Sequence, residues 1–231
     1  MTSCRRLIPL VLAMAGSCRN LVENSSPART PLIEAMLVAG TPSTKVRVRW
    51  LEPDGSIPTD ATTAEVVLTL VDGSGTRAGL EPFGAAPGHF RARLAISTGH
   101  RYSLVGSVGA QRIEASTTVP SRFTVHSPAG DSLRVSPTGT TASGPFGVVP
   151  FQWSSDGATV FAVESGYFVP AASYTTAVAG QLLLFGSRLR LLAMNRDLAG
   201  YLYASPAETN LTGAFGVLGA AIEIRKEIIW P

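Results

Sequence analysis

Charged and apolar side chains alternate strictly over residues 45–50. Such a period of two is typical of a β-strand with one face in the core and one in water, whereas in a helix the same residues would scatter around the axis. The residues expected in the core are Val46, Val48 and Trp50. Those expected in water are Lys45, Arg47 and Arg49.

Further β-type segments follow at intervals of roughly ten residues, separated by turn signals such as the glycine-rich stretch 72–75. They lie at residues 65–71, 90–94, 102–105 and 113–119. Their expected core residues are Val66, Leu68, Leu70, Phe90, Leu94, Tyr102, Leu104 and Ile113. Short strands without long helical periods predict an immunoglobulin-like or transthyretin-like antiparallel sandwich over residues 32–120. The Cys-Trp-Cys core of true immunoglobulins is absent, so the prediction concerns architecture alone.

The second half of the chain predicts a smaller β-rich region with one short helix. Residues 121–147, rich in Ser, Thr, Pro and Gly, are interpreted as a connector with one short strand at 132–136. Residues 148–231 form the C-terminal domain of the prediction. Its strands are expected at 148–153, 159–163, 181–193 and 221–230. Asn195 is the expected N-cap of a helix over 195–204. The glycine-rich residues 213–219 predict a tight turn or bulge. The whole chain is therefore expected to be mainly β.

The first residues have the pattern of an export signal. Arg5 and Arg6 precede an apolar run that is too short for a permanent membrane helix, and small residues lead to Cys18. Ala15-Gly16-Ser17-Cys18 resembles a lipobox, which predicts a signal peptide over 1–17, a lipid on Cys18 and a polar tether over 18–31. Lipidation also explains why the mature chain would hold a single cysteine. An ordinary signal peptide with an incidental cysteine is the alternative.

The charge balance argues against a nucleic-acid partner. The chain has 19 basic and 16 acidic residues, and loss of Arg5 and Arg6 with the signal peptide lowers the basic count to 17. The remaining arginines alternate along predicted strands instead of forming a patch, which is typical of a solvated sheet face.

No stretch predicts an active site. Gly130-Asp131-Ser132-Leu133 spells the nucleophile motif of one hydrolase family, but a triad needs a histidine near the C-terminus and none follows His126. Hydrolysis at Ser132 is therefore not expected. His89, His100 and His126 lack metal-ligand spacing, and the first two are expected at surface turns. The glycine-rich segment lacks the Lys-Ser/Thr ending of a phosphate loop. We expect no catalytic residue, cofactor or metal.

The order of several motifs resembles the DUF4249 family of bacterial lipoproteins, common in Bacteroidetes and their relatives. After the lipobox, the motifs are residues 37–40, 64–73, 88–90, 99–104, 119–120 with 131–133, and 201–219. The resemblance implies an envelope protein anchored to the outer membrane, since many members look like companions of TonB-dependent receptors. It predicts a non-catalytic binding or accessory subunit with membrane lipid and a receptor as partners. A surface carbohydrate- or matrix-binding module is the alternative.

Overall fold

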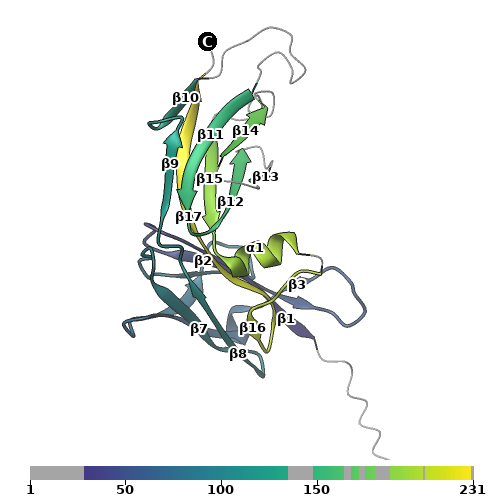
Figure 1. Ribbon diagram of the computed structural model, residues 1–231. Helices are drawn as coiled ribbons and strands as arrows, with labels where there is room; N and C mark the ends of the chain where they lie inside the picture. The colour runs from purple at the N-terminus through teal and green to yellow at the C-terminus, as the bar shows by residue number, and fades with distance from the viewer. Residues whose placement is uncertain are drawn as a thin grey trace, which may run out of the picture.

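The computed structural model describes residues 29–134, 148–163, 168–171, 175–179, 188–204 and 206–229. The prediction of a mainly β protein is confirmed: one large mixed sheet and one small sheet hold most of these residues, with one α-helix in the described part. The two lobes in Figure 1 share the long strand β17, which runs from one into the other. The predicted signal peptide, Cys18 and most of the tether lie outside the described residues.

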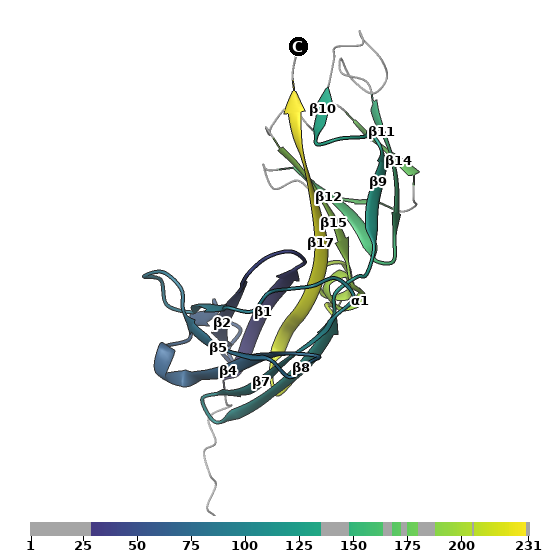
Figure 2. The same ribbon diagram turned by 90° about the vertical axis from the view of Figure 1, so that its left-hand side faces the viewer.

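The first lobe contains the strands of the predicted sandwich. They are β1 (Thr30–Val38), β2 (Thr44–Leu51), β3 (Thr59–Asp60), β4 (Val66–Asp72), β5 (Arg77–Pro82), β6 (His89–Ala92), β7 (Arg101–Val108) and β8 (Gln111–Thr118), with a 3-10 turn at Thr63–Glu65. In the large sheet they follow the order β1-β2-β6-β5-β4-β7-β8, and β16 (Leu211–Thr212) is added beside β8. In Figure 2 these strands fold over one another around a common interior, which holds the largest hydrophobic cluster.

The second lobe consists of two facing layers. The elements are β9 (Phe123–Ser127), β10 (Ser132–Arg134), β11 (Val148–Ser155), β12 (Ala158–Val163), β13 (Phe168–Ala171), β14 (Thr175–Ala179), β15 (Arg188–Met194), helix α1 (Arg196–Tyr203) and β17 (Phe215–Ile229). The small sheet has the order β14-β11-β9, and the end of the large sheet has the order β13-β12-β15-β17. A cluster with Phe151, Trp153, Leu189 and Ile228 fills this lobe.

Burial confirms the register expected from the alternation. All eleven residues expected in the core are buried, among them Val48 at 0% and Trp50 at 6% exposure. Lys45 and Arg47 are exposed as expected. The expectation for Arg49 is wrong: its side chain is only 19% exposed, because its guanidinium lies 2.7 Å from the Glu34 carboxylate of the neighbouring strand β1. The outer face of this sheet is thus covered at that point.

The C-terminal strand is longer than predicted and pairs in an unexpected direction. It begins at Phe215, inside the predicted glycine turn, and its first half lies parallel to β1. The sandwich is therefore not wholly antiparallel. Gly216 explains the close approach: its φ is +113°, and a Cβ there would lie 2.0 Å from the carbonyl oxygen of Ile33. The expected role of glycine, to let two backbones pass closely, is confirmed at this position.

Two local predictions in the second half have definite outcomes. The described part of the segment interpreted as a connector, residues 121–134, contains two strands where one was expected. Strand β9 pairs with β11, and β10 pairs with β17. The Asn195 side chain caps α1 by accepting a hydrogen bond from the backbone N–H of Leu198 at 3.1 Å, as predicted. Residues 135–147, 181–187 and Trp230 lie outside the described residues. No helix of the described chain has the length and apolarity needed to cross a membrane.

Candidate functional site

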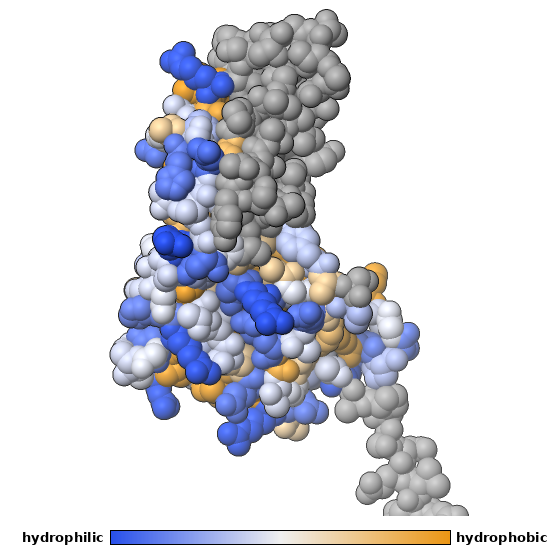
Figure 3. All heavy atoms as spheres, viewed as in Figure 1, coloured by the Kyte–Doolittle hydropathy of each residue, from blue (hydrophilic) through white to orange (hydrophobic). Residues whose placement is uncertain are grey.

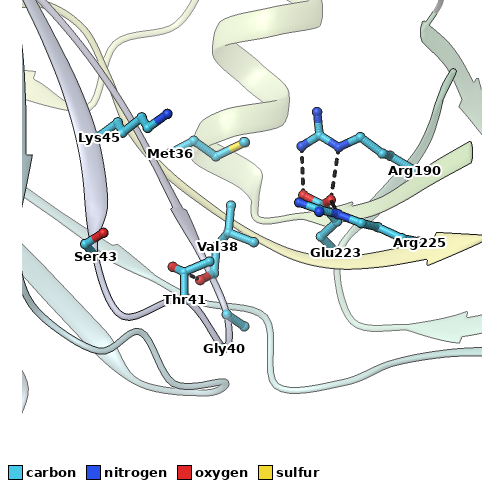
Figure 4. A pocket seen from close by; sticks show the side chains of 10 residues that line it. Met36, Val38, Gly40, Thr41, Ser43, Lys45, Arg190, Glu223 and Arg225 are labelled. Atoms are coloured by element: carbon cyan, nitrogen blue, oxygen red, sulfur yellow. Dashed lines mark hydrogen bonds and ion pairs between the residues drawn. The ribbon is translucent and has the colours of Figure 1, made fainter. Parts of the chain in front are cut away.

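A cavity of about 530 Å³ opens where β1, β2, β15 and β17 meet at the junction of the lobes. The residues that line it include Met36, Val38, Thr41, Ser43, Lys45, Arg190, Glu223 and Arg225. Figure 4 shows Lys45 from β2 and Arg190 from β15 extending from opposite walls, with the Met36 side chain between them. Strand β17 brings these walls together, because it pairs with β1 on one side and β15 on the other.

A second, more apolar cavity of about 380 Å³ adjoins the first beneath α1. The two cavities share Met36, Lys45 and Arg190. The additional apolar lining comes from β15, β17 and the helix: Leu192, Met194, Leu198, Leu202 and Val217. Four of these five residues belong to one small buried cluster, and Leu202 is half-exposed at the rim. We call the two cavities together the junction groove. Its volume is within the range of ligand sites in proteins.

The charges at one end of the junction groove centre on a buried carboxylate. Arg190 donates two hydrogen bonds to Glu223, at 3.0 and 2.7 Å, and Arg225 donates a third. Burial by itself would raise the pKa of Glu223, but these charged hydrogen bonds outweigh it and hold the pKa below its ordinary value. Glu223 is therefore ionised at neutral pH. Two arginines share this single carboxylate, so the cluster carries one excess positive charge.

The other charged residues of the groove differ in whether a side chain of opposite charge neutralises them. Glu34 accepts hydrogen bonds from Arg49 at 2.7 Å and from the Tyr201 hydroxyl at 3.0 Å. Arg47 lies 3.6 Å from the Asp60 carboxylate. Within the described residues the Lys45 ammonium pairs with no carboxylate; its contact is the Phe83 ring, 4.9 Å from the centroid. Lys45 therefore adds a second uncompensated cation to the groove.

The junction groove has to be interpreted from its own residues, because comparisons with family models and curated proteins find no match. The resemblance to the DUF4249 family accordingly stays a prediction, as do the partners that it implies.

The structure places Ser132 at the start of β10, on the exposed face of that strand. Its register partner on β17 is the exposed Glu227. Lys226 lines the same cavity as Ser132, but its ammonium donates its hydrogen bond to the Gly130 carbonyl oxygen. The described residues that line the neighbouring cavity include no histidine. His126 instead lies with its Nε2 atom 3.1 Å from the Ser154 hydroxyl. A triad around Ser132 thus finds no support in the geometry.

The remaining predicted site residues have simple placements. His100 is exposed beside a turn, as expected. His89 directly follows the turn at residues 87–88, as expected, but it is half-buried at the start of β6 and lines the apolar cavity. No group of three potential metal ligands occurs among the described side chains. Sequence reasoning missed the junction groove, because Lys45, Arg190 and Glu223 are far apart along the chain. Each of them appeared in the sequence only as one polar residue of an alternating strand.

Proposed function

We propose that this chain is a non-catalytic, lipid-anchored binding protein of a bacterial envelope that serves as an accessory subunit of an outer-membrane receptor of the TonB-dependent type. The junction groove carries the proposal. It combines an apolar floor with two uncompensated cations, a composition suited to holding a ligand. Among the described residues, neither the Thr41 nor the Ser43 hydroxyl of the groove is hydrogen-bonded to a histidine, a lysine or a carboxylate, so the groove offers no activated nucleophile of the serine type.

The anchor in this proposal is a diacylglycerol thioether on the Cys18 sulfur. The first strand begins at Thr30, so the residues before it would separate the folded part from the lipid headgroups. Metabolic labelling with palmitate tests this. Label is expected in the wild type and in Cys4→Ser, since Cys4 would leave with the signal peptide, and is expected to be lost in Cys18→Ser. Label that survives in Cys18→Ser would refute the anchor.

The receptor partner is testable by crosslinking from the groove. A photoreactive phenylalanine placed at Ser43, which lines the groove, is expected to capture an outer-membrane protein in intact cells. The same probe at Gln111, an exposed position on β8 that does not line the groove, serves as the control. Capture of no outer-membrane protein from position 43 by a correctly lipidated protein would contradict the receptor association.

No specific observation in the structure favours the alternative function, carbohydrate or matrix binding. Such sites stack sugars on exposed aromatic rings. Trp50 and Trp153 are only 6% and 4% exposed. Among the large apolar side chains that are exposed in the described residues, one, Tyr203, is aromatic. A glycan array with a clear hit would nevertheless promote this function over the receptor subunit.

A further inference from the structure

We infer that the junction groove binds an amphiphilic anion, a molecule with an apolar body and a carboxylate or phosphate head. Its acid group would lie between Lys45 and Arg190, and its apolar body would extend over Met36 beneath α1. This inference deepens the proposed function and rests on it, because it names the ligand class of the same groove.

The head-group assignment follows from the charge balance. The first cavity is lined by Lys45, Arg190 and Arg225 against the single carboxylate of Glu223. Arg47, which lines the second cavity, is offset by Asp60 at 3.6 Å. The uncompensated charge therefore gathers at the Lys45–Arg190 end. An anion placed between these two side chains would receive charge-assisted hydrogen bonds from both walls.

The assignment of the body follows from the second cavity. Its floor is formed by Leu192, Met194 and Val217, all of which are largely buried, while Leu202 of α1 remains 50% exposed at the rim. An apolar chain in this cavity would cover Leu202 and remove further apolar surface from water. Met36, between the two cavities, has a flexible thioether side chain that adapts to the shape of a ligand.

The arrangement of the two cavities gives the ligand one orientation. Lys45 and Arg190 line both cavities, so the cationic site is at one end of the apolar floor instead of surrounding it. A free inorganic anion would leave the apolar floor unused, and a neutral amphiphile would leave the two cations uncompensated. A single molecule with both features satisfies the whole groove. Space-filling Figure 3 shows hydrophilic and hydrophobic residues mixed across the front of the molecule where the lobes meet.

Isothermal titration of the full chain with Cys18→Ser, which has no lipid of its own, tests the inference. The probes are laurate, dodecyl phosphate, dodecyltrimethylammonium and inorganic phosphate, each below micellar concentration. We expect the two dodecyl anions to bind about tenfold or more tightly than the cation or inorganic phosphate. The tighter of the two anions would identify the head group as that of a fatty acid or of a phospholipid. Equal binding of dodecyltrimethylammonium would overturn the inference, since it would reveal unspecific adsorption.

Three variants locate the site. Lys45→Gln and Leu202→Ser change exposed side chains, so both are expected to fold, and each should weaken anion binding about fivefold. Arg112→Gln removes an exposed cation of β8 outside the groove and should leave binding unchanged. Wild-type affinity in both groove variants would overturn the inference. Receptor capture from position 43 without binding of any amphiphile would overturn it too, while the proposed function would stand.

Discussion

The contact between β1 and β17 makes a sharp prediction for Gly216→Ala. Gly216 has a φ of +113°, which L side chains rarely adopt, and a Cβ at this position would lie 2.0 Å from the Ile33 carbonyl oxygen. Real Cβ atoms essentially never approach within 3.0 Å of such an atom. The alanine therefore either forces the two strands apart or changes the backbone at the start of β17.

The expected loss of stability is the sum of two effects. A non-glycine residue held at positive φ costs about 1–3 kcal/mol. Separation of the strands weakens the neighbouring backbone hydrogen bonds between β1 and β17, worth about 0.5–1.5 kcal/mol each. If two such bonds are lost, the free energy of unfolding falls by about 2–6 kcal/mol. That is a large part of the stability of a typical domain.

Urea unfolding followed by far-ultraviolet circular dichroism measures this loss, and the chain offers a matched control. Gly79 is also a strand glycine, in β5, but a Cβ there would meet no atom within 4 Å. Gly79→Ala should leave stability unchanged or raise it by about 0.4–1 kcal/mol, because alanine restricts the unfolded chain. If the two variants changed the free energy of unfolding equally, the close approach of β1 and β17 would not be the reason for Gly216.

Three further predictions concern the lobe junction and the C-terminal strand. Burial and the Glu34 carboxylate raise the pKa of Tyr201 from 10.0 to about 12, so the folded state keeps a proton that the unfolded chain releases. In urea titrations of both proteins, the stability advantage of the wild type over Tyr201→Phe should be present below pH 10 and be lost as pH rises through 12. Burial lowers the pKa of Lys226 below its ordinary 10.5, so the unfolded chain binds this proton more tightly than the folded protein. The wild type should therefore gain stability relative to Lys226→Met as pH rises toward 10.5, and a constant difference between their urea unfolding free energies would contradict this. Deletion of residues 222–231 removes most of the part of β17 that pairs with β15 and β10, so it should unfold the second lobe, as measured by thermal circular dichroism. Full stability with loss of receptor capture would make this segment an interaction strand instead.

Local pattern was sufficient to predict most strands and their buried faces. The alternation over residues 45–50 assigned Val46, Val48 and Trp50 to the core, and all three are buried. The reason is that a strand has a side-chain period of two, so one buried face determines the orientation of every residue in it. Asn195 was also predictable, because its capping hydrogen bond to Leu198 involves only neighbours along the chain.

Tertiary structure alone decided which strands pair and what they bring together. The parallel contact of β1 with β17 joins segments about 180 residues apart, and period-two patterning is the same for parallel and antiparallel partners. The low exposure of the Arg49 side chain depends on Glu34 in the neighbouring strand, which no pattern within one strand records. The junction groove arises in the same way: Lys45, Arg190 and Glu223 become neighbours because β17 pairs with both β1 and β15. Sequence thus determined the faces of the strands, while packing between distant strands created the candidate site, because a binding site depends on proximity in space and not along the chain.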